Sequence, residues 1–438
     1  MVLAMTQKPV TQGKPPGKGK PPKESVCNFD GICQHEERID KAFCDDCAPK
    51  SYPPLDTMVS PQIVTLFTRD YPDLYEERGP QIFQFRFDGV YEDTWASQFS
   101  QSGRNAHAIS IGSIDRYNEP VVVSIVSQRT KYRATVYYDQ EIYLFHHGNT
   151  TGLPDQVLPY ERVYGYADLA RDSIIADVDN DTRNELVVVG GNKAKIFEWK
   201  GDHFELEWES EDLGSRVWSV DVGDADGDDL NELVLAMFSI GSALIFDNHT
   251  SGQGGVWTSV ATESLNGLPV PSDGVFIDVA KVRDLDPNKG NGNEIVAGGN
   301  FSRLAIWKYG YKQGDEEPGY HLEFLSDDLG GFTQYVDAGD VDGDGDLEIL
   351  VDASQTLTLH LFDFDFGNQA DLDWSQFSVT PVRREGGGVS GIAFADFDGD
   401  GRDEAVVDTW GISIYELDDD GDFQATFTSA YGGPLEIR

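Results

Sequence analysis

A short acidic loop, each time followed by a run of aliphatic residues, occurs five times between Asp177 and Glu404. Four copies share a nine-residue length, with acids at positions 1, 3, 5 and 9: 177–185, 224–232, 340–348 and 396–404. The remaining copy, 284–294, is two residues longer. A lone Asp-x-Asp-x-Asp segment is common in turns, but turn formation alone does not explain four same-spaced copies that each end in Glu.

The spacing of the acids predicts calcium sites. Carboxylates at positions 1, 3, 5 and 9 can converge on one hard cation, and a backbone carbonyl from position 7 completes an oxygen cage of calcium type. We therefore expect four or five Ca²⁺ ions, and in the longer loop the extra residues must bulge out before the terminal Glu reaches the ion. The predicted ligands are Asp177, Asp179, Asp181, Arg183 and Glu185; Asp224, Asp226, Asp228, Leu230 and Glu232; Asp284, Asp286, Asn288 and Glu294; Asp340, Asp342, Asp344, Asp346 and Glu348; and Asp396, Asp398, Asp400, Arg402 and Glu404.

The flanks of these loops are typical of strands, not of the helices that enclose a helical calcium hand. Short apolar runs bounded by Gly and Asp predict buried strands. They precede the loops at 173–176, 217–220 and 391–394, and follow them at 186–189, 233–235, 295–297, 349–351 and 405–407. Alternating segments such as 195–199 and 204–208 continue the pattern, so each repeat is predicted to be a four-stranded antiparallel unit.

The distance between loops predicts a ring of such units. The terminal Glu residues are about 47 to 62 residues apart, which is the period of a propeller blade with variable loops. A shortened copy at 115–119 has lost its ligands and is expected to hold no metal, and segments 81–85 and 91–95 predict a half-blade before it. We therefore predict an all-β, seven-bladed β-propeller of four-stranded antiparallel blades over 55–438. We expect 434–438 to help close the ring, because closure removes free sheet edges.

The loops and their flanking strands resemble the FG-GAP/VCBS repeats of integrin-α-type β-propellers, over roughly residues 106–420. In that family the loop carboxylates bind calcium, so the resemblance implies the same role for the loop positions named above. The chain departs from the family pattern at Thr182 and Asp229, where Gly is common, and in its long third loop.

The net charge of the chain restricts the kinds of partner that it can bind. The chain has 77 Asp and Glu against 33 Lys and Arg, for a formal net charge of −44. Repulsion argues against nucleic acid and anionic membrane surfaces as partners. No stretch approaches the roughly 18 apolar residues that cross a bilayer, so no membrane insertion is expected.

The N-terminal region differs in composition from the rest. Residues 1–24 contain five Lys with repeated Pro and Gly, which predicts an extended tail. A plain linker is the favoured interpretation, and contact with the acidic body of a neighbouring copy is the alternative. The opening five residues are too short for the apolar region of a signal peptide.

All four cysteines fall within residues 25–50, as Cys27, Cys33, Cys44 and Cys47. An even, local cluster is typical of two disulfides or a zinc site. Cys44-x2-Cys47 with His35 suits zinc, but Cys27-x5-Cys33 is a poor second half. We favour two disulfides, with zinc and free thiols as alternatives. The segment 30–47 also resembles a small Cys-rich module of secreted microbial proteins.

An extracellular or cell-surface location is expected. Calcium loops of low affinity suit an exterior rich in calcium. Asn149, Asn248 and Asn300 lie in Asn-x-Ser/Thr sequons and would be glycosylation sites in a secreted protein. Asn180 also fits the sequon but lies inside a calcium loop.

No motif for catalysis is apparent. The eight histidines lack the spacing of paired metal ligands, and neither a Gly-x-Ser-x-Gly elbow nor a phosphate loop occurs. The acidic run 418–422 is expected to be a solvated hairpin turn. Six tryptophans recur at blade positions and are expected in the core, not as sugar platforms: Trp199, Trp208, Trp218, Trp307, Trp374 and Trp410.

The function predicted from these features is non-enzymatic. We expect an extracellular, calcium-stabilised propeller for adhesion, binding or self-assembly, with a protein partner or further copies of itself. The alternative is a carbohydrate-binding lectin or polysaccharide lyase that uses one face of the ring.

Overall fold

The computed structural model describes strands within residues 2–98 by their backbone, and most of residues 104–428 together with side chains. The remaining described segment is 436–437. The gaps within 104–428 are 115–119, 133–134, 147–153, 165–167, 239, 248–256, 265–275, 286–292, 312–316, 365–373, 376, 385–388, 390, 409–411 and 419–420. The expected basic tail beyond Met5 and the Cys-rich module lie outside the described residues.

Every element of the described residues is a β-strand, and these strands form six antiparallel sheets of four strands and one of five. The first sheet contains β1 (Val2–Met5), β2 (Gln62–Leu66), β3 (Arg78–Arg86) and β4 (Val90–Gln98). The second contains β5 (Arg104–Ser113), β6 (Pro120–Tyr132), β7 (Thr135–Phe145) and β8 (Gln156–Val163). The third contains β9 (Ala170–Ala176), β10 (Glu185–Gly190), β11 (Lys193–Trp199) and β12 (Phe204–Glu209).

The later sheets repeat this meander. The fourth contains β13 (Val217–Gly223), β14 (Glu232–Met237), β15 (Ser242–Asp247) and β16 (Thr258–Ser264). The fifth contains β17 (Ile277–Arg283), β18 (Glu294–Gly299), β19 (Ala305–Gly310) and β20 (Gly319–Leu325). The sixth contains β21 (Val336–Gly339), β22 (Glu348–Ala353), β23 (Thr358–Phe364) and β24 (Phe377–Arg383). The seventh contains β25 (Gly391–Ala395), β26 (Glu404–Asp408), β27 (Ile412–Leu417), β28 (Phe423–Thr428) and β29 (Glu436–Ile437).

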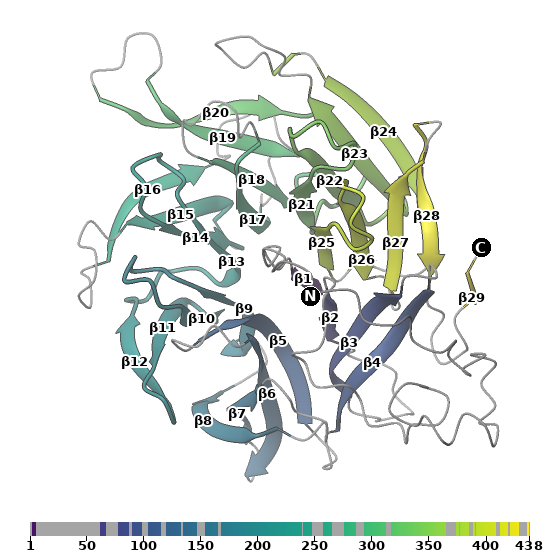
Figure 1. Ribbon diagram of the computed structural model, residues 1–438. Helices are drawn as coiled ribbons and strands as arrows, with labels where there is room; N and C mark the ends of the chain where they lie inside the picture. Colours follow the sequence, from purple (N-terminus) through teal and green to yellow (C-terminus); the bar gives the residue numbers. More distant parts are fainter. Residues whose placement is uncertain are drawn as a thin grey trace, which may run out of the picture.

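The first strand of each sheet faces a common centre, and the following strands lie progressively farther out (Figure 1). These inner strands contact one another in the order β5, β9, β13, β17, β21, β25 and β1, and β1 also contacts β5. The arrangement is propeller-like and all-β, as the sequence predicted. Each regular acidic loop connects the first and second strands of its sheet, which confirms the strands predicted on either side of the loops.

The two chain ends depart from the expectation. Val2–Met5, within the expected tail, is the inner strand of the first sheet and pairs with β2. The C-terminal strand β29 pairs instead with β28 at the outer edge of the seventh sheet. The expectation that 434–438 closes the ring was therefore wrong, because the inner position is supplied from the N-terminal end of the chain.

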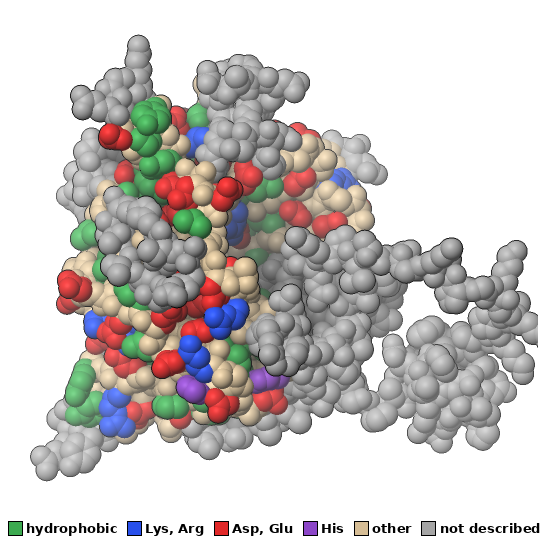
Figure 2. All heavy atoms as spheres, turned by 60° about the vertical axis from the view of Figure 1, so that its left-hand side comes forward, with side chains coloured by type: hydrophobic (Ala, Val, Ile, Leu, Met, Phe, Trp, Pro, Cys, Tyr) green, Lys and Arg blue, Asp and Glu red, His purple; other side chains and the backbone are tan. Residues whose placement is uncertain are grey.

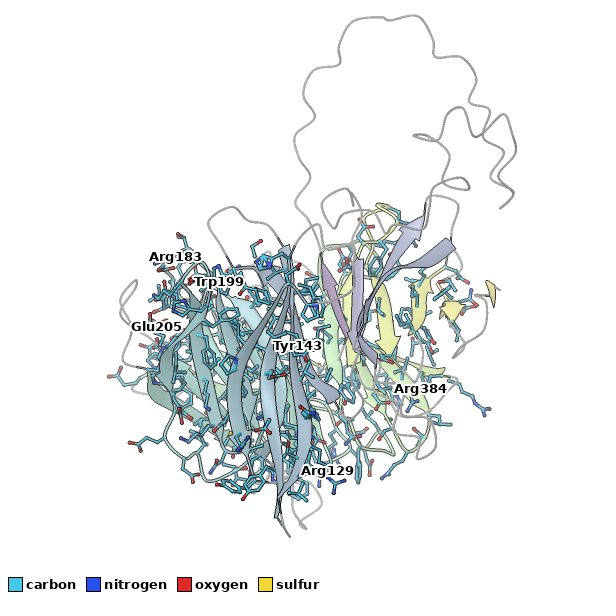
Figure 3. The ribbon with its side chains drawn as sticks, turned by 90° about the horizontal axis from the view of Figure 1, so that it is seen from below. Arg129, Tyr143, Arg183, Trp199, Glu205 and Arg384 are labelled. Atoms are coloured by element: carbon cyan, nitrogen blue, oxygen red, sulfur yellow. The ribbon has the colours of Figure 1, made fainter. Side chains whose placement is uncertain are left out.

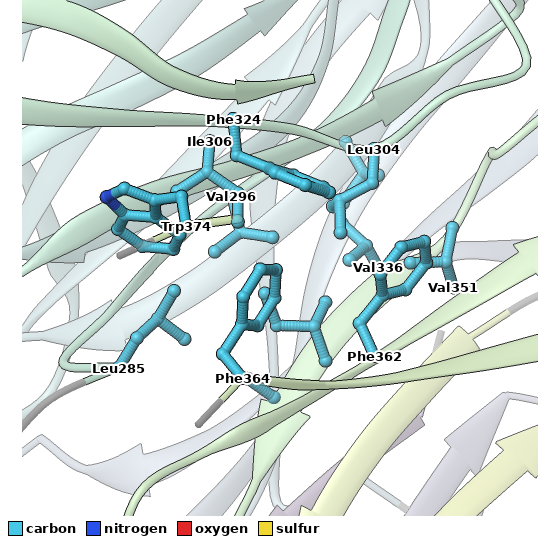
Figure 4. Packing of buried hydrophobic residues seen from close by; sticks show 13 residues of the cluster. Leu285, Val296, Leu304, Ile306, Phe324, Val336, Val351, Phe362, Phe364 and Trp374 are labelled. Atoms are coloured by element: carbon cyan, nitrogen blue, oxygen red, sulfur yellow. The ribbon is translucent and has the colours of Figure 1, made fainter. Parts of the chain in front are cut away.

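The apolar core lies between neighbouring sheets. Phe324 of β20, Phe362 and Phe364 of β23 and Trp374 pack in one cluster that joins the fifth and sixth sheets (Figure 4). The Phe324 and Phe364 rings meet edge to face, with centroids 5.1 Å apart. Such contacts add to the stabilisation by burial. The strands of one sheet therefore depend on the next sheet for their stability.

Small residues and buried acids bring the inner strands together. A Cβ on Gly223 at the end of β13 would lie 2.8 Å from Cγ1 of Val282 on β17, so this approach requires Gly. The buried carboxylate of Asp221 accepts a hydrogen bond from the Val282 backbone N–H at 2.9 Å. Arg283 bridges Asp221 and Asp337, and so joins three successive inner strands.

Within the part of the chain that the structure describes, no helix has the length and hydropathy needed to cross a bilayer.

Candidate metal centres

Each of the four regular loops brings three carboxylates together. In each group, one oxygen from each residue lies within 4.8 Å of the others. The groups are Asp177, Asp179 and Glu185; Asp224, Asp226 and Glu232; Asp340, Asp342 and Asp344; and Asp396, Asp398 and Glu404. Twelve of the predicted ligands therefore converge, and each set lies at the same place in its sheet.

Backbone hydrogen bonds fold the four loops in the same way. The carboxylate at position 1 accepts the N–H of position 6 at 3.0 to 3.2 Å. The carboxylate at position 3 accepts the N–H of position 5 at 3.0 to 3.2 Å. The terminal Glu accepts the N–H of position 2 at 2.6 to 3.0 Å. Because these bonds are local, the nine residues themselves determine where the acids point.

Positions 4 and 6 take a left-handed backbone conformation in all four loops. Gly at both positions of the last two loops suits this conformation, with φ between 79 and 94°. In the first loop Asn180 has φ 60° and Thr182 has φ 75°, and in the second loop Asp229 has φ 69°. The β-branched Thr182 is the most strained of these, since a branched side chain rarely adopts positive φ.

The acids at position 5 differ between loops. Asp344 belongs to its cluster, whereas Asp181, Asp228 and Asp400 lie outside the converging groups. Arg183 binds Asp181 through its side chain, and Arg402 binds Asp400 at 2.7 Å. Burial raises the pKa of Asp400, but the bonds from Arg402 outweigh this effect and hold the pKa below its ordinary value. The ligand role predicted for the position-7 carbonyls of Arg183, Leu230, Asp346 and Arg402 stays a prediction.

The terminal Glu residues lie in an environment that disfavours negative charge. Burial raises the pKa of Glu185, Glu232 and Glu404 to about 8 and that of Glu348 to about 9. Nearby Asp carboxylates contribute to these raised pKa values, although less than burial does. A bound divalent cation would stabilise the ionised forms, because an opposite charge nearby favours a carboxylate.

Glu232 provides the direct test of fit. Its side chain is fully buried, at 0% exposure. Its Oε2 accepts hydrogen bonds from Ala225 and Asp226, whereas its Oε1 has no hydrogen-bond partner. Leaving a buried carboxylate oxygen unsatisfied is costly, and a metal ion beside Asp224 and Asp226 would satisfy it. The residues of this loop therefore fit a hard cation such as Ca²⁺.

The longer loop is described only in part. Glu294 accepts the N–H of Leu285 at 3.0 Å, as in the regular loops. The predicted ligands Asp286 and Asn288 lie outside the described residues, as does the shortened loop at 115–119.

Two sets of residues near the clusters were missed by the sequence reasoning. On the third strand of each sheet, Asp247, Asp363 and Glu416 act electrostatically on the clusters and raise the pKa of Glu232, Glu348 and Glu404, respectively. Residues at position 8 of a loop bind the preceding sheet: the Asn184 side chain donates to Ser113 O at the end of β5, and Asp403 N–H donates to Asp340 O of the preceding loop. Only the strand register and the packing of neighbouring sheets reveal these contacts.

The first acidic loop lies toward one edge of the molecule. Figure 3 places Arg183 of the first loop, with Trp199 and Glu205, near the upper rim in that view, and Arg129 and Arg384 lower down. Asp and Glu side chains are spread over the described surface on the side shown in Figure 2.

The remaining predictions concern the tryptophans and the acidic turn 418–422. Trp307 and Trp374 are buried, Trp208 packs on Phe246, and Trp218 stacks on Phe238. Burial confirms the core position expected for Trp307 and Trp374, whereas Trp208 and Trp218 are half-buried. Trp410 lies outside the described residues. Asp418 and Asp422 flank the β27–β28 turn, and Asp418 N–H binds Asp422 O at 3.1 Å.

Two of the three predicted glycosylation sites, Asn149 and Asn248, lie outside the described residues. Asn300 is half-buried, and its Oδ1 accepts a hydrogen bond from Phe276 N–H at 2.6 Å.

Comparison with known proteins supports the repeat and the fold. Residues 177–235, which contain the first two regular loops, match an FG-GAP-like repeat. A solved structure of a candidate 6-phosphogluconolactonase from Bacteroides uniformis is similar, with a TM-score of 0.50 and 10% sequence identity over 83% of this chain and 94% of that chain. At that identity the likeness shows the fold alone. A sequence search finds no match among curated proteins.

Proposed function

We propose that this chain is a seven-bladed, calcium-stabilised β-propeller that works outside the cell as a non-enzymatic binding or assembly protein. The observation that carries the proposal is the recurrence of a cluster of three carboxylates in the corresponding loop of four sheets. The buried, unpartnered Oε1 of Glu232 supports a cation there.

The position of the clusters supports a structural role for the metal. In three of the four loops the cluster includes the Glu that begins the second strand, so a bound ion ties that strand to the end of the inner strand of the same blade. Ions that bind only the folded chain stabilise it, by about 2.7 kcal/mol per site when the free ion exceeds Kd a hundredfold. The loop carboxylates therefore serve to stabilise the blade through the bound ion.

Thermal unfolding with and without calcium tests this proposal. The purified chain should unfold several degrees higher in millimolar CaCl₂ than in excess EDTA, and MgCl₂ should restore less, because Mg²⁺ demands a stricter octahedral geometry. An unchanged melting temperature would contradict calcium stabilisation.

The acidic surface supports a partner of opposite charge or the chain's own basic N-terminal segment. In our proposal Cys27, Cys33, Cys44 and Cys47 form two disulfides, and Asn149, Asn248 and Asn300 carry glycans, as suits an exported protein. Electron microscopy of the native material separates rings, filaments and monomers. A monomer at all concentrations would argue against self-assembly.

Glycan binding is the second candidate. Tyr164 and Tyr311 have exposed rings, at 71% and 69%, and aromatic rings of this kind can stack on sugars. Binding on a glycan array, or turnover of an acidic polysaccharide, would favour a lectin or lyase over a self-assembling protein.

A further inference from the structure

One register position distinguishes the longer loop from the four regular ones. In each of these sheets, the residue after the loop Glu pairs with a residue on the third strand, such as Ile349 with Phe362 and Ile295 with Trp307. The next residue on the third strand therefore lies opposite the loop Glu. It is acidic beside all four regular loops, as Glu198, Asp247, Asp363 and Glu416, but beside the longer loop it is Lys308.

From this position Lys308 contacts the loop Glu. Its ammonium forms an ion pair with Oε1 of Glu294. Glu294 is fully buried at 0% exposure, and only 15% of the Lys308 side chain is exposed. The other oxygen of Glu294 accepts Leu285 N–H at 3.0 Å, so the carboxylate is held from both sides.

The equivalent Glu of the second loop has no ammonium beside it. Glu232 makes the same bond from Oε2 to the loop backbone, but its Oε1 has no hydrogen-bond partner. The Oε1 of Glu232 would face a cation in the fourth sheet. The corresponding Oε1 of Glu294 in the fifth sheet is neutralised by Lys308. Replacement of an acid by lysine also changes the local charge by two units and places a positive charge where a divalent ion would approach.

We propose that the ammonium of Lys308 takes the place of calcium in the longer loop, so that the chain binds four calcium ions and not five. This inference rests on the proposed calcium binding of the regular loops. It assigns Lys308 as the residue that neutralises Glu294 in the fifth sheet, whose loop is held without metal.

Ion counting with a reciprocal substitution tests the proposal. Calcium bound per folded chain, measured by equilibrium dialysis and elemental analysis, should be four for the wild type. Asp363→Lys, which gives the sixth sheet the arrangement of the fifth, should bind three, whereas Asp363→Asn should retain four. Five ions in the wild type, or four in Asp363→Lys with its fold confirmed by circular dichroism, would overturn the proposal.

A stability measurement separates this inference from the proposed function. Lys308→Met leaves Glu294 buried without its ammonium, so its melting temperature should fall equally in CaCl₂ and in EDTA. Lys193→Met, which removes an exposed ion pair with Glu209, is the matched control and should change little. If the wild type bound no calcium, the proposed function would fail, but the Lys308 comparison would still decide the role of the ammonium. An effect no larger than that of Lys193→Met would contradict it.

Discussion

The side-chain amide of Asn231 donates a hydrogen bond to the backbone carbonyl of Asp177 at 2.7 Å, although the two residues belong to different sheets. Asn231 is position 8 of the second acidic loop, and Asp177 is position 1 of the first. Backbone bonds from Asn293 to Asp224 and from Leu347 to Leu285, at 3.0 and 3.4 Å, extend the chain of contacts through the next loops. Neighbouring acidic loops are thus connected directly through the residue that precedes the terminal Glu.

Asn231→Ala should weaken two sites at once. The substitution removes a hydrogen bond to a partly buried carbonyl, so the free energy of unfolding should fall by about 1 kcal/mol. Calorimetric titration should show lower calcium affinity at two sites, because Asn231 belongs to one loop and braces another. Gln424→Ala removes a single exposed bond to Asp418 and is the control. A change confined to one site would show that the contact does not couple the loops.

Glu232→Gln should have opposite effects with and without calcium. In EDTA the variant should be as stable as the wild type or more stable, since a neutral amide replaces a buried carboxyl whose pKa is raised by burial. In saturating calcium it should be less stable, because the site loses a charged ligand. Melting temperatures in both buffers check this, with Glu205→Gln on an exposed part of β12 as the control. Equal destabilisation in the two buffers would mean that Glu232 has no role in metal binding.

Thr182→Gly should stabilise the first loop. Thr182 has φ 75°, a conformation that costs an L-residue about 1 to 2 kcal/mol. Glycine relieves this strain but loses more entropy on folding, so a net gain of about 0.5 to 1 kcal/mol is expected in urea unfolding. The equivalent Asp229→Gly should gain less, because Asp tolerates positive φ better. A loss of stability in Thr182→Gly would show that the hydroxyl or methyl group makes a contribution larger than the strain.

His107 should contribute to acid sensitivity. Burial, and secondarily the charge of Arg171, lower the pKa of His107 to about 4 in the folded chain. The unfolded chain has the ordinary value of about 6.5, so it binds a proton first as the pH falls. The contribution to stability is present above pH 6.5 and is lost as the pH falls toward 4, by about 3 kcal/mol at most.

Urea unfolding between pH 7 and 4 checks the His107 prediction. The difference in stability between His107→Gln and the wild type should shift in favour of the variant as the pH falls through this window. His203→Gln is the matched control, since His203 is exposed and lies beside Asp202. Parallel pH profiles for His107→Gln and the wild type would show that His107 does not titrate differently on folding.

The acidic loops were predictable in detail because their structure is local. The bonds that orient Asp177 and Asp179 are made to N–H groups of the same nine residues. The flanking strands were predictable for a similar reason, since runs such as 186–189 are wholly apolar and mostly β-branched, and β10 is almost fully buried. A short pattern therefore specified both the loop and the two strands that it connects.

The chain ends were not predictable in the same way. The inner strand of the first sheet comes from Val2–Met5, a segment with no repeat around it and about 57 residues from its partner strand. Nothing in local composition states which distant segment fills an inner position, because that choice depends on the strand edges left unpaired by the rest of the ring.

The sequence by itself determined an all-β repeat protein and the carboxylates of its four regular loops, since both follow from patterns shorter than ten residues. Only the tertiary structure decided which residues face those carboxylates from elsewhere. Lys308 reaches Glu294 through strand register, and Asn231 reaches Asp177 through the packing of adjacent sheets. Register and packing bring together residues 14 to 54 positions apart, and no local pattern encodes such pairs.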